Sequence, residues 1–131
     1  GIAVTELTAI GREEWPAVTM IVFRNYQWGA EKRNSTLWYE DNFIGTELDD
    51  KVSYAGIAQA CGLQGVQART MDELTAALHT AVEDQMKHGK TTLIEAMINQ
   101  ELGEPFRRDA MKNPVAVAGI SADDMRVQTV E

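Results

Sequence analysis

The chain has 131 residues, of which 44% are hydrophobic and 24% are charged, as expected for one soluble globular domain rather than a disordered segment. Its formal net charge of −8 argues against a general nucleic-acid-binding protein, because neutralisation of phosphates requires a basic surface. The single cysteine, Cys61, excludes an internal disulfide and suits a reducing, cytoplasmic location, and no apolar run approaches the roughly 20 residues of a membrane span.

The first part of the chain predicts a helix, a strand and a long connection. Residues 5–14 have the apolar spacing of a short amphipathic helix, and Pro16 lies beyond its end. A continuous apolar and β-branched run over residues 18–23 predicts a strand that is covered on both faces. Residues 26–51 show no sustained period, and a connection of this length is typically functional or partly helical. We expect part of it to be mobile or displaced when no cofactor is bound.

Helices and strands alternate along the middle of the chain. Ser53 can cap a helix over residues 53–61 that Gly62 ends, and residues 65–68 form a short strand candidate. In the next helix Thr70 and Glu73 form a capping box, and a glycine at position 89 marks the C-terminal end. The apolar stripe of this long helix, which we expect to face the core, consists of Leu74, Leu78, Val82 and Met86.

Strands that alternate with helices place the protein in the α/β class, with an open parallel sheet and helices on both faces. Residues 92–98 supply the last predicted strand. We therefore divide the chain into a domain over residues 1–98 and an extended C-terminal tail over residues 99–131, packed on the domain or on a partner. The chain opens on a helix where a domain of this class ordinarily opens on a strand. This predicts either a variant fold or a chain that begins inside a larger protein.

The connection after the first strand begins where a ligand site is expected, because open α/β sheets bind ligands at the carboxyl ends of their strands. Asn25 offers a neutral oxygen suited to Mg²⁺ or Ca²⁺, and the main-chain carbonyl of Gln27 could bind the same ion. The main-chain amides from Tyr26 to Gly29 could hold a diphosphate. The alternative is that Arg24 and Asn25 merely end a strand, since Asn is a common turn residue.

Two other groups of residues are open to more than one interpretation. Arg107 and Arg108 suit a sulfonate or phosphate substrate, or they form a solvated surface cluster with the neighbouring acidic residues. Tyr26 and Trp28 either pack around a cofactor or hold the loop against the domain.

Four blocks of sequence carry a resemblance to a known family. They are "FRNYQWGAEKRN" (residues 23–34), "NFIGTELDD" (42–50), "YAGIAQACGLQGV" (54–66) and "GEPFRRDAMKNPV" (103–115). In this order, and over nearly the whole chain, they resemble the C-terminal domain of the sulfoacetaldehyde acetyltransferase family. The resemblance implies the pyrophosphate-binding domain of a thiamine diphosphate enzyme, with thiamine diphosphate and Mg²⁺ as cofactors of the intact enzyme.

The resemblance also implies a metal site of known composition. In the family the protein ligands are the Asp of a Gly-Asp-Gly motif, the second Asn of an Asn-Asn pair, and the main-chain carbonyl two residues further on. The last two match Asn25 and Gln27, with Arg24 in the place of the first Asn, so that residues 24–29 form the implied cofactor-binding segment. The Gly-Asp-Gly motif would precede Gly1. We therefore expect the domain to lack this motif and its first sheet strand.

The resemblance implies that a second domain is needed for catalysis. The glutamate that activates the cofactor belongs to the pyrimidine-binding domain of a partner subunit, so we expect a homo-oligomer and no turnover by this chain alone. The intact enzyme would convert sulfoacetaldehyde and phosphate to acetyl phosphate and sulfite. The alternatives are the same domain of another thiamine diphosphate carboligase or decarboxylase, such as an acetolactate synthase-like enzyme, or a stand-alone, non-catalytic α/β module.

Overall fold

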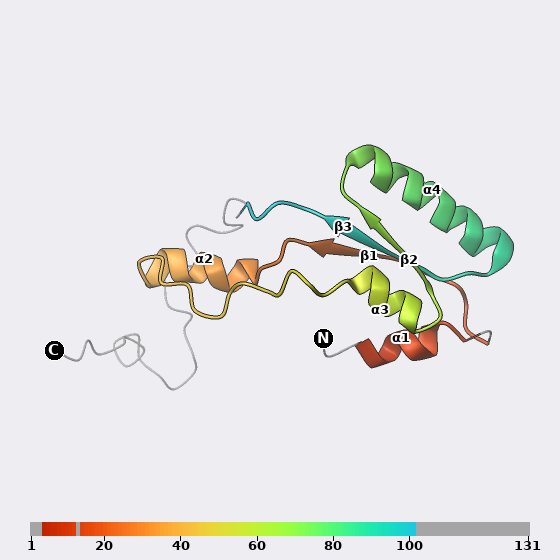
Figure 1. Ribbon diagram of the computed structural model, residues 1–131, viewed down its shortest axis with the longest axis horizontal. Helices are drawn as coiled ribbons and strands as arrows, with labels where there is room; N and C mark the ends of the chain where they lie inside the picture. The colour runs from red at the N-terminus through yellow and green to blue at the C-terminus, as the bar shows by residue number, and fades with distance from the viewer. Residues whose placement is uncertain (1–3, 13, 102–131) are drawn as a thin grey trace, which may run out of the picture. The chain divides into compact units, whose positions relative to one another are not determined.

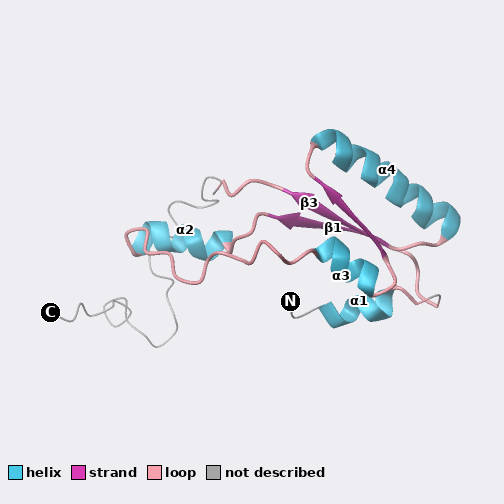
Figure 2. Ribbon diagram, viewed as in Figure 1, coloured by secondary structure: helices cyan, strands magenta, loops and turns pink. Residues whose placement is uncertain are grey.

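The structure is a computed structural model, and it describes residues 4–12 and 14–101. Its elements are, in chain order, α1 (Val4–Ile10), β1 (Thr19–Arg24), α2 (Gly29–Trp38), α3 (Tyr54–Ala60), β2 (Gln64–Ala68), α4 (Met71–His88) and β3 (Thr92–Met97). Within these residues the strands form one parallel sheet in the order β1-β3-β2 (Figure 2). The predicted α/β class with an open parallel sheet is confirmed.

Helices cover both faces of the sheet, with α4 on one face and α1 and α3 on the other (Figure 1). The core is correspondingly split by the central strand β3. On the α3 side, Leu93 packs with Ala58 and Leu63, whereas on the α4 side Ile94 packs with Ala68 and Ala81. All but the last residue of β3 are buried, as a strand between two neighbours and two helical layers should be.

The predicted helix ends in the middle of the chain are confirmed. Ser53 caps α3 by accepting from Gly56 N–H at 3.0 Å, and Thr70 caps α4 by accepting from Glu73 N–H at 3.1 Å. The helix α4 ends at Gly89, whose φ of 62° lies in the left-handed region that glycine adopts without strain.

The first helix and the first strand differ from the prediction. The helix α1 ends at Ile10, four residues earlier than expected, and Gly11 follows it. A Cβ atom at Gly11 would lie 2.5 Å from Cδ2 of Leu63, so a larger residue at this position would clash with the core. The strand β1 is not covered on both faces, because Ile21 and Phe23 are exposed on the side that faces the α4 layer. Among the described strands β1 lies at an edge of the sheet, next to β3 alone.

The predicted apolar stripe of α4 is also wrong in its second half. Leu74 and Leu78 pack against the core as expected, but Val82 and Met86 are largely exposed. Residues four apart are rotated by about 40° around a helix of 3.6 residues per turn, so a stripe of this spacing turns gradually away from the buried side of the helix. Ala81, outside the predicted stripe, is the residue that α4 buries there.

The long connection contains α2, which no periodicity in the sequence located. It begins directly after the turn that follows β1 and extends beyond the carboxyl end of that strand (Figure 1). The structure describes the first residues of the predicted tail up to Glu101, and residues 102–131 lie outside the described part. The division at residue 98 therefore stays a prediction.

Candidate functional site

The turn from Asn25 to Trp28 joins β1 to α2 at the carboxyl end of the sheet. The side chain of Asn25 closes the turn, because its Oδ1 accepts from Gln27 N–H at 3.2 Å. Two main-chain hydrogen bonds then attach the turn to a neighbouring segment: Trp28 N–H donates to Thr46 O at 2.7 Å, and Leu48 N–H donates to Tyr26 O at 2.8 Å.

This pairing determines where the main chain of Gln27 points. Gln27 faces Glu47 in an isolated antiparallel bridge, flanked on both sides by the two hydrogen bonds of residues 26 and 28. In such a pair the N–H and C=O of the central residue point away from the partner strand. The N–H of Gln27 meets the side-chain oxygen of Asn25, so the carbonyl oxygen of Gln27 opens on the same side. The turn thus presents two neutral, hard oxygen donors on one side.

Tyr26, between these two donors, has an unusual backbone. Its φ of 57° lies in the left-handed region, which costs energy for a bulky residue and persists only where the surrounding structure supports it. The aromatic ring lies over the guanidinium of Arg24, 4.4 Å from ring centre to Cζ. The turn can therefore keep its shape only while the surroundings hold Tyr26 in this conformation.

The helix α2 starts next to the turn, and its N-terminus is free of a side-chain cap. Trp28 occupies the cap position, and its side chain forms no capping hydrogen bond. The first amides of a helix have no partner within the helix, so those of Gly29, Ala30 and Glu31 are available to an anion. The amides of Gln27 and Trp28, which the sequence also suggested for a diphosphate, already donate to Asn25 Oδ1 and to Thr46 O, respectively.

Arg24 lies beneath the turn rather than in the open. Its side chain is 3% exposed, and its terminal Nη2 donates to the main-chain oxygen of Asp49 at 2.7 Å. The guanidinium contacts two aromatic rings, because its Cζ is 4.4 Å from the centre of the Tyr26 ring and 4.9 Å from the centre of the Tyr54 ring. Its Nε is 3.4 Å from Oε1 of Glu95.

Glu95, on the central strand, is fully buried and takes contacts from three other elements. Its Oε2 accepts from Ser53 Oγ and Ala55 N–H, both at 3.1 Å, and from Gln67 Nε2 at 3.0 Å. Its Oε1 faces Arg24. Sequence reasoning missed Glu95, although a carboxylate in the middle of the apolar run TLIEAM was a usable signal, because a buried charge needs a partner.

The environment of Glu95 keeps it ionised at neutral pH. Burial is the largest single influence and raises its pKa, because desolvation disfavours the charged form. Hydrogen bonds to the carboxylate act in the opposite direction, and the donors are Ala55 N–H, the Gln67 side chain, Tyr54 N–H and the Ser53 hydroxyl. Together they outweigh burial and hold the pKa of Glu95 below its ordinary value.

Polar contacts also hold the outer side of the turn. Gln27 is buried, and its Nε2 donates to Gln100 O at 2.8 Å, whereas its Oε1 has no hydrogen-bond partner among the described residues. Gln100 in turn donates to Glu47, which also pairs with Lys32 of α2. Hydrogen bonds from Lys32 and Gln100 lower the pKa of Glu47. Residues just beyond β3 are therefore part of the support of the turn.

The structure thus places Arg24 to Gly29 at the carboxyl end of β1. Within this segment Arg24 and Gln27 are buried. Trp28 is 54% exposed and does not plug the loop into the core. Arg107 and Arg108, the candidate substrate residues, lie outside the described part of the chain. Among residues 4–12 and 14–101 no three His, Cys, Asp or Glu side chains are grouped, and the two oxygen donors of the turn are a side-chain amide oxygen and a main-chain carbonyl, which are both uncharged.

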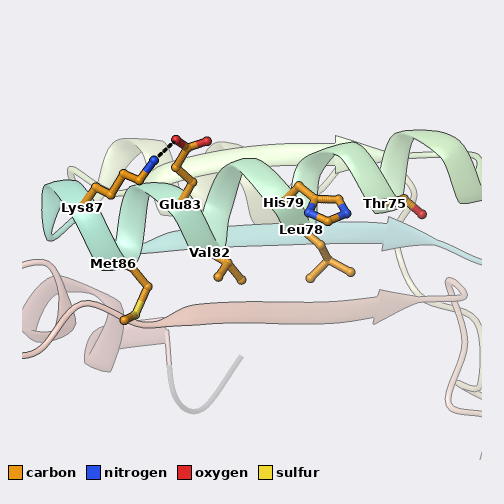
Figure 3. Close-up of a pocket in the computed structure, with 7 residues that line it drawn as sticks. All are labelled: Thr75, Leu78, His79, Val82, Glu83, Met86 and Lys87. Atoms are coloured by element: carbon orange, nitrogen blue, oxygen red, sulfur yellow. Dashed lines mark hydrogen bonds and ion pairs between the residues drawn. The ribbon is translucent and has the colours of Figure 1, made fainter.

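The described residues also contain a groove that lies apart from the turn. It measures about 680 Å³ along α4, and Figure 3 shows Leu78, Val82 and Met86 pointing toward β1 below the helix. The other side of its lining is polar and includes the Glu83–Lys87 ion pair. Within the same residues no helix is long and apolar enough to cross a membrane.

Known proteins match the chain over most or all of its length. It is 79% identical over 131 residues to sulfoacetaldehyde acetyltransferase of Roseovarius nubinhibens, and 79% identical over 128 residues to that of Rhodobacter capsulatus. A more distant relative is the sulfoacetaldehyde acetyltransferase of Castellaniella defragrans, 44% identical over 115 residues, or 88% of this chain and 19% of that protein. The alignments with the first two relatives cover 100% and 98% of this chain. The chain spans only about 22% of the length of either relative.

Solved structures and family patterns agree with these relatives. The benzoylformate decarboxylase of Polynucleobacter necessarius has the same fold, with a TM-score of 0.66 over 79% of this chain and 18% of that one, at 22% identity. The pattern of the family "Thiamine pyrophosphate enzyme, C-terminal TPP binding domain" matches residues 1–96, which include the turn, Arg24 and Glu95. The chain therefore belongs to the family of C-terminal thiamine pyrophosphate-binding domains of thiamine pyrophosphate enzymes.

Proposed function

We propose that the chain is the diphosphate- and metal-anchoring domain of a thiamine diphosphate-dependent sulfoacetaldehyde acetyltransferase. The observation that carries the proposal is the turn itself: Asn25 Oδ1 and the main chain of Gln27 lie on one side of it, directly before the uncapped N-terminus of α2. The 79% identity over the whole chain to two acetyltransferases supports this choice of reaction over other members of the family.

The donors of the turn fit the implied cation. Mg²⁺ prefers hard oxygen ligands, and it usually takes few of them from protein, with phosphate oxygens and water completing its coordination. Asn25 would supply its amide oxygen, and Gln27 its main-chain carbonyl. On the family pattern a third ligand is the aspartate of a Gly-Asp-Gly motif, which is not found in the 131 residues.

The neighbouring helix would hold the anionic end of the cofactor. The amides of Gly29, Ala30 and Glu31 point out of the N-terminus of α2, where the helix dipole favours negative charge. Trp28, which is half exposed beside them, offers an apolar wall. Arg24 would act from below, through the shape of the turn, because its guanidinium already contacts Glu95, Asp49 O and two tyrosine rings.

The reaction would be the conversion of sulfoacetaldehyde and phosphate to acetyl phosphate and sulfite. The carbon–sulfur bond breaks with sulfite as leaving group, and the acetyl group is transferred to a phosphate oxygen without net oxidation. Bound thiamine diphosphate supplies the carbanion stabilisation that this chemistry needs, while the protein positions it. A pyrimidine-binding domain of a partner subunit in a homo-oligomer would provide the activating glutamate.

A titration of the chain with thiamine diphosphate and MgCl₂, followed by NMR, tests the anchoring role. We expect Mg²⁺-dependent shifts of the Gln27 and Gly29 amides, at an affinity weaker than low micromolar because one expected ligand is absent. Asn25→Ala should abolish the Mg²⁺ dependence, and Asn42→Ala, at an exposed asparagine outside the turn, should preserve it. Equal responses of the two variants, or no response of the wild type, would contradict the proposal.

A chimera tests the reaction. The matching segment of the Roseovarius nubinhibens acetyltransferase is replaced by this chain, and the release of sulfite and acetyl phosphate from sulfoacetaldehyde is measured. We expect activity close to that of the parent and its loss with Asn25→Ala. A folded, cofactor-binding chimera without this activity would favour another carboligase or decarboxylase, and a chimera that binds no cofactor would favour a non-catalytic module.

A further inference from the structure

We propose that Glu95 is a positioning residue for the oxygen donors of the Asn25–Gln27 turn, acting through Arg24 and Tyr26. The inference rests on the proposed function only in what the turn binds. The shape of the turn is a property of this chain alone. Glu95 itself does not touch the turn, and its contacts lead to it in two steps.

The first step is the link between Glu95 and Arg24. Val22 is the residue of β1 that lies opposite Glu95 in the sheet, and Arg24 is two residues further on, on the same face. Residues that are diagonal neighbours on one face of a sheet are close enough for a long side chain such as that of Arg24 to reach across to Glu95. The carboxylate divides its contacts: Oε2 accepts from Ser53 Oγ, Ala55 N–H and Gln67 Nε2, whereas Oε1 lies next to the Arg24 guanidinium.

The second step is the link between Arg24 and Tyr26. The guanidinium is fixed at both ends, by Glu95 at Nε and by the main-chain oxygen of Asp49 at Nη2. Its plane is thereby available to the rings of Tyr26 and Tyr54, at 4.4 and 4.9 Å. Such stacking is specific to a planar cation, which a lysine would not reproduce.

The consequence for the site follows from the backbone of Tyr26. Its left-handed φ of 57° turns the chain between the two oxygen donors, and this conformation needs external support. The ring contact with Arg24 and the hydrogen bond from Leu48 N–H to Tyr26 O supply that support. When Glu95 is uncharged, Arg24 keeps its hydrogen bond to Asp49 O but loses its ion pair, and its contact with the Tyr26 ring is weakened.

Amide hydrogen exchange of the full chain, measured by NMR without ligand, tests the proposal. In Glu95→Gln we expect the amides of Gln27, Trp28 and Leu48 to lose roughly tenfold more protection than those within α4, whose exchange reports the overall loss of stability. The control is Gln67→Met, which removes one donor to Oε2 and leaves the Arg24 side untouched. Unchanged turn amides in Glu95→Gln, or the same acceleration of turn and α4 amides, would overturn the proposal.

A second variant keeps the test decisive if Glu95→Gln is too unstable. The double variant Arg24→Met with Glu95→Met removes both charges, so that no unpaired charge is left in the core. We expect it to fold and still to lose protection at the turn. Wild-type protection at Gln27, Trp28 and Leu48 in the double variant would show that the pair does not position the turn.

The ligand arm uses Mg²⁺ with thiamine diphosphate as the probe. We expect Glu95→Gln to weaken Mg²⁺-dependent binding by roughly tenfold, which corresponds to about 1.4 kcal/mol. We expect Gln67→Met to leave this binding unchanged. If the wild-type chain shows no binding, the proposed function fails, and exchange at the turn still decides the role of Glu95. Tight binding by Glu95→Gln with a loosened turn would refute positioning of the donors by this residue.

Discussion

The Nε of Arg24 lies 3.4 Å from Oε1 of Glu95, and the two side chains are 3% and 0% exposed. Neither atom has a hydrogen-bond partner among the described residues, so the contact between them is an ion pair rather than a well-aligned hydrogen bond. It joins the central strand β3 to the last residue of β1. The pair is thus placed where the sheet ends and the turn begins, and its contribution can be measured.

Loss of the charge of Glu95 should be costly for stability. Glu95→Gln leaves Arg24 buried without a counterion, and breaking a buried pair in this way costs about 3–5 kcal/mol in the free energy of unfolding. Urea denaturation followed by circular dichroism measures this loss. The control is Glu83→Gln, which breaks an exposed pair with Lys87 on α4 and should cost less than about 1 kcal/mol. Similar losses in the two variants would argue against a buried, uncompensated charge.

The pKa of Glu95 predicts a specific acid sensitivity. Because this pKa is lower in the folded than in the unfolded state, the carboxylate stabilises the fold fully above the unfolded value, about 4.3, and this contribution is lost as the pH falls through the folded value. The free energy of unfolding of the wild type should therefore decrease more below that pH than that of Glu95→Gln. Glu47 also has a lowered pKa, but it is present in both proteins, so their difference isolates Glu95. Parallel pH profiles would contradict the prediction.

Local signals in the sequence were sufficient for most of the fold. Capping residues at Ser53 and Thr70 and the stop at Gly89 gave the ends of α3 and α4, because each acts through hydrogen bonds or a backbone conformation within a few residues. The exposure of Phe23 and Met86 could not be read in this way. It depends on which neighbours cover a strand or a helix face, and an apolar run carries no information about them.

The site was predicted in part for the same reason. Asn25 and Gln27 were proposed because they follow a strand end and match a family motif, and the structure places both in the turn after β1, where Asn25 Oδ1 accepts from Gln27 N–H. Glu95 was missed because its role arises from a contact with a residue 71 positions away, across the sheet. The helix α2 was missed because its ten residues lack an apolar stripe, and periodicity gives no indication of its position next to the turn.

The two side-chain caps allow the contribution of Ser53 to Glu95 to be separated from its role in α3. Ser53→Ala removes a cap and also a donor to Glu95 Oε2, whereas Thr70→Ala removes a comparable cap at α4, far from the carboxylate in the hydrogen-bond network. Loss of a cap alone costs about 1 kcal/mol. We expect Ser53→Ala to cost about 1 kcal/mol more than Thr70→Ala in chemical denaturation, because a buried acceptor loses a partner. Equal costs would show that the other donors compensate.

Two glycines near α3 provide a final test of how packing supports the turn. A Cβ atom at Gly65 would lie 2.1 Å from the main-chain oxygen of Ala55, so Gly65→Ala must displace α3 from β2 at the residue whose N–H binds Glu95. At Gly62 the space is open and the cost lies in its left-handed φ of 84°, about 1–2 kcal/mol for an alanine. Overpacking at Gly65 costs a similar or larger amount, about 1–3 kcal/mol, so stability alone does not separate the two variants. Amide exchange does: Gly65→Ala should accelerate exchange at Trp28 because it displaces α3 and with it the Tyr54 ring that lies over the Arg24 guanidinium, and Gly62→Ala should not. Faster exchange at Trp28 in both variants would mean that the turn responds to overall stability rather than to the contacts of Arg24.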